Sequence, residues 1–120
     1  MEKEFVSYEM ALALKELGFN EPCYDNYNIY GKLWGLRLNK QVKIKGACLA
    51  PTYSQAFRFF REKYKLPSWV YTSDNEKFYY GILRDTRFLI DGNKPYETYE
   101  EAEWACLIKV IEVVILAQKK

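Results

Sequence analysis

The chain contains no histidine, and this absence excludes most of the common catalytic arrangements. Serine and cysteine nucleophiles are usually activated by a neighbouring histidine. Zinc sites usually combine histidine with paired cysteines. Neither of the glycine-rich phosphate motifs, GxGxxG and GxxxxGK[ST], occurs in the sequence. We therefore expect no catalytic residues, no metal site and no cofactor. An enzyme that works through Asp, Glu, Tyr or Cys alone is the least favoured functional alternative.

Cysteine is scarce and unpaired in its spacing. The three cysteines, Cys23, Cys48 and Cys106, are far apart and no CxxC occurs. A disulfide framework would show an even and denser set. We expect three reduced and mostly buried thiols, as is typical of a cytoplasmic protein.

Long hydrophobic runs are also missing. The N-terminus mixes acidic and basic residues, and no apolar stretch of signal-peptide length follows it. The most apolar segment, residues 110–117, contains Glu112 and is far shorter than the roughly 20 residues of a membrane span. The sequence therefore predicts a soluble cytoplasmic protein with no membrane partner.

The excess of one charge over the other is small, whereas aromatic residues are plentiful. With 18 basic and 16 acidic residues, the net charge of +2 predicts no polyanionic partner by itself. The chain has 11 Tyr, 7 Phe and 3 Trp. Such rings remove much surface from water, so we expect most of them in the core and on half-buried sheet faces. A platform on which ligands or bases stack is the alternative.

Capping signals predict three helices. The first begins after Ser7 and ends at Gly18, where Phe19 is expected to pack back on Leu14 as in a Schellman motif. The second and third helices begin at the capping boxes TYSQ (residues 52–55) and TYEE (residues 98–101). A proline, Pro67, ends the second helix. Capping and the helix dipole also explain why glutamates are clustered near the start of the third helix. We favour this explanation over a magnesium site formed by these glutamates. They are Glu97, Glu100, Glu101 and Glu103.

Alternating patterns and turn signals predict strands between the helices. The predicted strands are residues 32–38, 42–45, 69–72, 78–83 and 87–90, and residues 22–31 are either a loop or an edge strand. The last three form an antiparallel meander. We therefore predict an α+β fold, with three helices packed on a mainly antiparallel sheet of about five to six strands. A chain of 120 residues fits one compact domain over residues 1–120. Its predicted core includes Leu14, Leu17, Phe57, Phe60, Ala105 and Ile108.

One set of basic residues is a candidate nucleic-acid-binding surface. Arg58, Arg61 and Lys65 recur along one face of the second helix, and Lys43 and Lys45 share a face of the preceding strand. If these faces adjoin, they form a patch that would neutralise phosphates. An ordinary solvated helix face and strand face is the competing interpretation.

The last helix is apolar over most of its circumference, with few charged interruptions after Trp104. It lies either in the centre of the fold or against another chain, so a homodimer through this C-terminal helix is one alternative. Tyrosine and tryptophan are enriched at protein interfaces. A candidate interaction surface therefore comprises Tyr71, Tyr79, Trp104, Val110 and Val114.

Three segments carry a resemblance to a known group of proteins. They are FVSYEMALALKELGFNEPCY, APTYSQAFRFFREKYKL and YETYEEAEWACLIKVIEVV, in this order. Together they resemble a family of small uncharacterised proteins from phages and mobile elements of gut Bacteroidetes. The resemblance covers the helical segments and implies a bacterial host cytoplasm and an accessory role, but no functional residues.

These observations favour a non-enzymatic protein-interaction module that acts on an unidentified host or phage protein. The alternative is a nucleic-acid-associated protein that uses the basic and aromatic surface. The affinity of a nucleic-acid-associated protein for nucleic acid should fall log-linearly with salt concentration, whereas the affinity of an apolar protein interface should not.

Overall fold

The computed structural model describes residues 4–35, 37–73, 76–85, 87–90 and 94–119, the segment 87–90 by its backbone only. These residues form three helices and five strands. The chain divides into two compact units, Met1–Ala56 and Phe57–Lys120. The single domain over residues 1–120 therefore stays a prediction, whereas the α+β class is observed.

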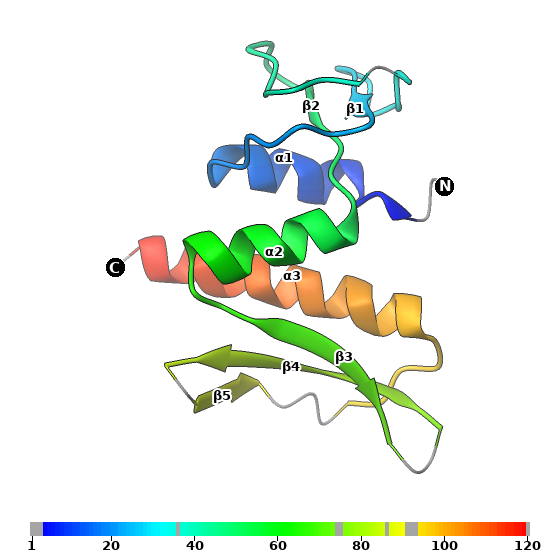
Figure 1. Ribbon diagram of the computed structural model, residues 1–120, viewed down its shortest axis with the longest axis vertical. Coiled ribbons are helices and arrows are strands. Elements are labelled where there is room, and N and C mark those ends of the chain that lie inside the picture. Colours follow the sequence, from blue (N-terminus) through cyan, green and yellow to red (C-terminus); the bar gives the residue numbers. More distant parts are fainter. Residues whose placement is uncertain (1–3, 36, 74–75, 86, 91–93, 120) are drawn as a thin grey trace. The chain divides into compact units, whose positions relative to one another are not determined.

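The first helix of unit 1 is α1, Tyr8–Glu16 (Figure 1). It is capped as the sequence predicts. The Ser7 hydroxyl accepts a hydrogen bond from the backbone N–H of Met10 at 3.3 Å. At the other end Gly18 has φ +98°, and the N–H of Phe19 donates to the carbonyl of Leu14 at 2.9 Å. This is the bonding of a Schellman motif, which satisfies carbonyls that the helix itself leaves open.

A small antiparallel sheet completes unit 1. Its strands are β1 (Asn26–Tyr27) and β2 (Cys48–Leu49), and α1 packs on β2. Strand β1 lies inside the segment that the sequence left open as a loop or an edge strand. The buried side chains of this unit include Val6, Leu14, Phe19, Cys48 and Leu49.

The strands predicted at residues 32–38 and 42–45 are wrong. The described residues of the first segment contain only isolated bridges, and Leu36 lies outside the described residues. The second segment contains no strand. Gly31 and Gly35 adopt φ values of +77° and +74°, which lie outside the extended region. Two left-handed residues so close together bend the chain away from a strand, and the segment forms a loop.

The second helix, α2 (Tyr53–Lys63), begins with the predicted capping box. The Gln55 N–H donates to the Thr52 hydroxyl at 3.2 Å, and the Thr52 N–H donates to Gln55 Oε1 at 3.0 Å. The helix ends before Pro67 acts, because Lys65 takes a left-handed φ of +59° and the N–H of Leu66 donates to the carbonyl of Phe60. The boundary between the two units falls within this helix.

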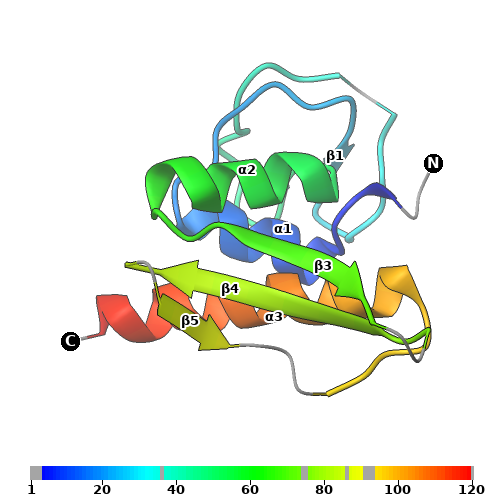
Figure 2. The ribbon, with the colours of Figure 1, turned by 60° about the horizontal axis from the view of Figure 1, so that its bottom comes forward.

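Unit 2 contains the predicted meander and the last helix. Strands β3 (Ser68–Thr72), β4 (Phe78–Arg84) and β5 (Arg87–Ile90) pair antiparallel in chain order. Helix α3 (Tyr99–Gln118) packs on β3 and β4 and runs along the sheet (Figure 2). The Thr98 hydroxyl caps it by accepting from the Glu101 N–H at 3.1 Å. No helix in the described part of the chain is both long and apolar enough to cross a bilayer.

The predicted single sheet of five to six strands is not observed. Within the described ranges the strands fall into one sheet of two and one sheet of three, because the loop after Gly31 supplies none. The core prediction holds in part. Leu14, Leu17 and Phe60 are buried as predicted, but Phe57, Ala105 and Ile108 are only half-buried.

Candidate functional site

The most distinctive surface of unit 1 is the segment 24–46, which we call the basic–aromatic loop. It carries five basic residues and one acidic residue, Asp25. Its formal charge is therefore +4, against +2 for the whole chain, so the rest of the chain is slightly acidic. All five basic side chains are exposed: Lys32, Arg37, Lys40, Lys43 and Lys45.

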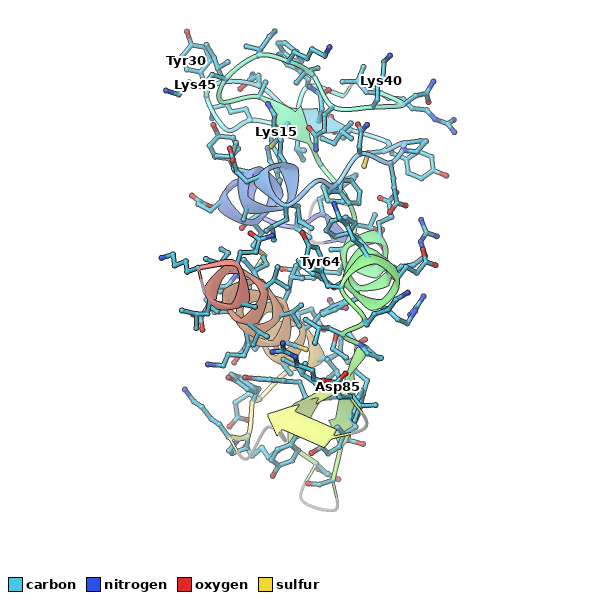
Figure 3. All side chains as sticks on the ribbon, turned by 90° about the vertical axis from the view of Figure 1, so that its left-hand side faces the viewer. Lys15, Tyr30, Lys40, Lys45, Tyr64 and Asp85 are labelled. Carbon is cyan, nitrogen blue, oxygen red and sulfur yellow. The ribbon has the colours of Figure 1, made fainter. Side chains whose placement is uncertain are left out.

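Large apolar side chains are exposed among these charges. Tyr30 is 79% exposed, Tyr24 65% and Trp34 50%, and the aliphatic Ile29 and Ile44 are about half exposed. Single exposed apolar residues are common, whereas several within one short segment make that segment a candidate for interaction. Figure 3 shows Tyr30 and Lys45 together at one edge of the loop and Lys40 at the opposite edge.

Helix α1 holds this loop through two polar side chains. The ammonium group of Lys15 donates to the carbonyl oxygens of Ile44 and Ala47 at 3.1 and 2.7 Å. The hydroxyl of Tyr8 donates to the carbonyl of Gly46 at 2.6 Å. Hydrogen bonds from a charged donor are stronger than neutral ones, so Lys15 is an effective anchor.

Gln41 ties the loop to the end of α1 and to the sheet. Its side-chain amide donates to the carbonyl of Phe19 at 3.0 Å and accepts from the N–H of Leu49 at 3.0 Å. Its backbone N–H donates to Asn20 Oδ1 at 2.6 Å. The C-terminal part of the loop is therefore fixed to residues that precede and follow the loop in the chain.

Two side chains shape the loop from within. Asp25 Oδ1 accepts from its neighbour's N–H at 2.8 Å and from the N–H of Gly35 at 2.6 Å. Asn28 Oδ1 accepts from the N–H groups of Tyr30 and Lys32 at 2.9 and 3.1 Å. The one carboxylate of the loop thus holds the backbone, and no ion pair with it is observed for the described lysines.

The predicted nucleic-acid-binding residues lie in both units. Lys43 and Lys45 are exposed in the basic–aromatic loop of unit 1. Arg58, Arg61 and Lys65 are exposed on α2 and just after it, within unit 2. The sequence interpretation did not include Tyr24, Tyr30 and Trp34 in this surface, because it assigned Trp34 to a strand and left residues 22–31 open as a loop or an edge strand. The sequence signal that could have identified this surface is its composition: residues 24–46 combine five basic residues and several aromatic rings with a single acidic residue.

The residues of the predicted interaction surface differ in their exposure. Tyr71 is 40% and Trp104 50% exposed, and the rings of Tyr71 and Tyr79 stack with centroids 5.7 Å apart. Val110 and Val114 are buried, at 0% and 3% exposure, so they do not lie on a surface. Burial of these valines accounts for much of the apolar circumference of α3, and the homodimer stays a prediction.

The cysteines are poorly suited to nucleophilic chemistry. All three are buried and free. Burial raises the pKa of Cys23 and Cys106 to about 12 and that of Cys48 to about 11. Since the thiolate is the reactive form, these groups are inert at neutral pH.

The buried thiols lead to a direct prediction. In the native protein near pH 8, we expect all three to react with Ellman's reagent at least about a hundredfold more slowly than in guanidinium. A pKa of about 12 leaves roughly a thousandth of the usual thiolate at Cys23 and Cys106, and a pKa of about 11 leaves roughly a hundredth at Cys48. The absorbance of the released thionitrobenzoate measures the rate. A single thiol that reacts rapidly without denaturant would contradict the burial described here.

Other candidate sites are weaker. A cavity of about 180 Å³ lies in unit 2 beside Tyr64, Arg84 and the last turns of α3, but drug-sized ligands occupy roughly 300 Å³ or more. In the described part of the chain, no three His, Cys, Asp or Glu side chains are grouped as a metal site requires. Among the glutamates near the start of α3, Glu97 pairs with Lys77. Burial raises the pKa of Glu103.

Comparisons with protein-family models, with curated proteins and with solved structures found no match to this chain. No functional residue is therefore carried over from another protein. The function has to be inferred from the charges, rings and hydrogen bonds of the basic–aromatic loop.

Proposed function

We propose that the protein is a non-enzymatic binding module that holds a negatively charged partner on its basic–aromatic loop. The observation that carries this proposal is the charge of the loop, where five exposed cations accompany one carboxylate. That carboxylate accepts two backbone N–H groups, so it is occupied in holding the loop's own shape.

The same charges would serve both encounter and binding. A cluster of one sign raises the local concentration of an oppositely charged partner and speeds association. The clamps from Lys15, Tyr8 and Gln41 hold the loop before a partner arrives. A surface that is ordered in advance loses less conformational entropy on binding than a flexible one.

Charge reversal tests this proposal. We expect the triple variant Lys40→Glu, Lys43→Glu, Lys45→Glu to bind heparin, used as a model polyanion, about a hundredfold more weakly near 0.1 M salt, since each lost phosphate-type contact removes roughly one unit of salt slope. Titration calorimetry at several salt concentrations measures affinity and slope together.

The matched control reverses the same number of charges on the other predicted basic residues. The variant Arg58→Glu, Arg61→Glu, Lys65→Glu has the same net charge as the loop variant, and we expect it to bind heparin almost like the wild type. An equal loss in both variants would show that binding follows net charge alone and would overturn the assignment to the loop. Circular dichroism confirms that each variant is folded.

A second candidate function keeps the expectation from the sequence, a protein-interaction module for a host or phage protein in the cytoplasm. The exposed Trp104 and the stacked pair of Tyr71 and Tyr79 favour it, because such rings are enriched at interfaces. A pull-down from host lysate, with and without nuclease, compares the two. Loss of a nuclease-resistant protein partner in Trp104→Ala, but not in the loop triple variant, would favour this second candidate.

A further inference from the structure

We propose that the partner of the basic–aromatic loop is a single-stranded nucleic acid, whose bases stack on Tyr24, Tyr30 and Trp34 while its phosphates lie at Lys40, Lys43 and Lys45. This inference rests on the proposed function and names the class of its ligand. It joins two properties of the loop, its charge and its exposed rings.

The rings are the first part of the argument. Tyr24, Tyr30 and Trp34 are each at least half exposed and fall within one short stretch of chain. Charge alone would attract any polyanion and needs no aromatic side chain. Every base has a flat π face, and stacking on a protein ring contributes about 1–3 kcal/mol per base.

The contact between Arg37 and Tyr24 is the second part. The Arg37 guanidinium carbon lies 5.1 Å from the centroid of the Tyr24 ring, a cation–π geometry. This contact steadies a ring that is otherwise 65% exposed. It also places a positive charge beside the stacking surface, which is the combination that proteins use on single strands.

Backbone hydrogen bonds hold the other two rings in place. The N–H of Trp34 donates to the carbonyl of Asn26 at 3.0 Å, and the next N–H, that of Gly35, donates to Asp25. The N–H of Tyr30 donates to Asn28 Oδ1 at 2.9 Å. The backbone that carries Tyr30 and Trp34 is therefore held by hydrogen bonds, which lowers the entropy cost of stacking on these two rings.

The geometry favours a single strand over a duplex and over an acidic protein. A duplex keeps its bases stacked inside, and its major groove is typically entered by a helix or a two-stranded ribbon. The described part of the loop contains no helix and no two-stranded ribbon, and its only strand is the two-residue β1. An acidic protein would match the lysines, but its carboxylates are anions and do not stack on the electron-rich faces of the rings. A single strand supplies regular charge and free base faces together.

Fluorescence anisotropy with labelled oligonucleotides tests the proposal. We expect oligo-dT or oligo-rU of about 12 nucleotides, within the usual site size of such surfaces, to bind at least about tenfold more tightly than a duplex of the same length. The deoxy and ribo strands, run in parallel, distinguish the two chemical sources of the ligand. Binding to both single strands at similar strength would fit stacking, which does not depend on the sugar.

A pair of tryptophan variants separates stacking from charge. Trp34 and Trp104 are both 50% exposed, but only Trp34 lies in the loop. We expect Trp34→Ala to weaken oligonucleotide binding about tenfold without changing the salt slope, and Trp104→Ala to bind like the wild type. Tyr30→Ala gives a second test at a side chain that is 79% exposed, where a folding defect is not expected.

The outcomes distinguish this inference from the proposed function. Equal binding of duplex and single strand, or unchanged affinity in both Trp34→Ala and Tyr30→Ala, would overturn the single-strand assignment. If heparin still binds and its binding still depends on the loop lysines, the proposed function stands without the single-strand assignment. Absence of binding to both heparin and oligonucleotides would overturn both proposals.

Discussion

Replacing Phe60 with alanine is expected to lower the free energy of unfolding by about 3–5 kcal/mol. The Phe60 side chain is completely buried, and its ring lies 5.2 Å from that of Phe59 and 5.8 Å from that of Tyr64, between centroids. Truncation removes these contacts and leaves a cavity that the surrounding rings fill only in part. Urea denaturation followed by circular dichroism measures the loss.

Phe57 offers a matched control one turn earlier in the same helix. Its side chain is only half-buried, so Phe57→Ala leaves a smaller cavity and should cost less than about half as much as Phe60→Ala. Equal losses at the two positions would show that the apolar face of α2 differs from the one described. A loss of this expected size is a large share of the total stability of a small protein.

Replacing Gly31 with alanine is expected to cost about 2–4 kcal/mol, through two separate effects. Gly31 has φ +77°, a conformation that is strained for any residue with a Cβ. An added Cβ would also lie 2.9 Å from Cδ2 of Tyr8. The Tyr8 ring cannot move away easily, because its hydroxyl donates to Gly46 at 2.6 Å. Thermal unfolding measures the total.

Gly35 separates the two effects. It has a similar φ of +74°, but a Cβ there would meet nothing within 4 Å. Gly35→Ala should therefore show the backbone strain alone, about 1 kcal/mol. If both substitutions cost the same, the close approach of Gly31 to Tyr8 does not matter for stability. If Gly31→Ala also weakens heparin binding, then binding depends on how the loop packs on α1.

The helices were largely predictable because their signals are local. The cap at Ser7, the left-handed Gly18 and the box between Thr52 and Gln55 each involve residues within a few positions of one another. The meander of unit 2 was predictable for the same reason, since short turns join strands that alternate in polarity. Even the β-branched stretch of α3 follows a strong cap and is helical.

The loop was not predictable from local pattern. Residues 32–38 alternate like a strand, but Gly31 and Gly35 bend the chain, and the anchors that hold the result come from distant positions. Lys15 reaches carbonyls 29 and 32 residues away, and Tyr8 reaches one 38 residues away. A pattern of neighbouring residues carries no information on such partners.

The sequence by itself determined the starts of the three helices, the C-terminal cap of α1, the antiparallel meander, the absence of histidine and the positive charge of residues 24–46. Only the tertiary structure decided which apolar residues remain exposed. Val110 and Val114 are buried although they were expected on a surface, whereas Tyr30 and Trp34 are exposed on the loop. The physical reason is that burial depends on the packing of segments far apart in the chain, while caps and turns depend on hydrogen bonds between near neighbours.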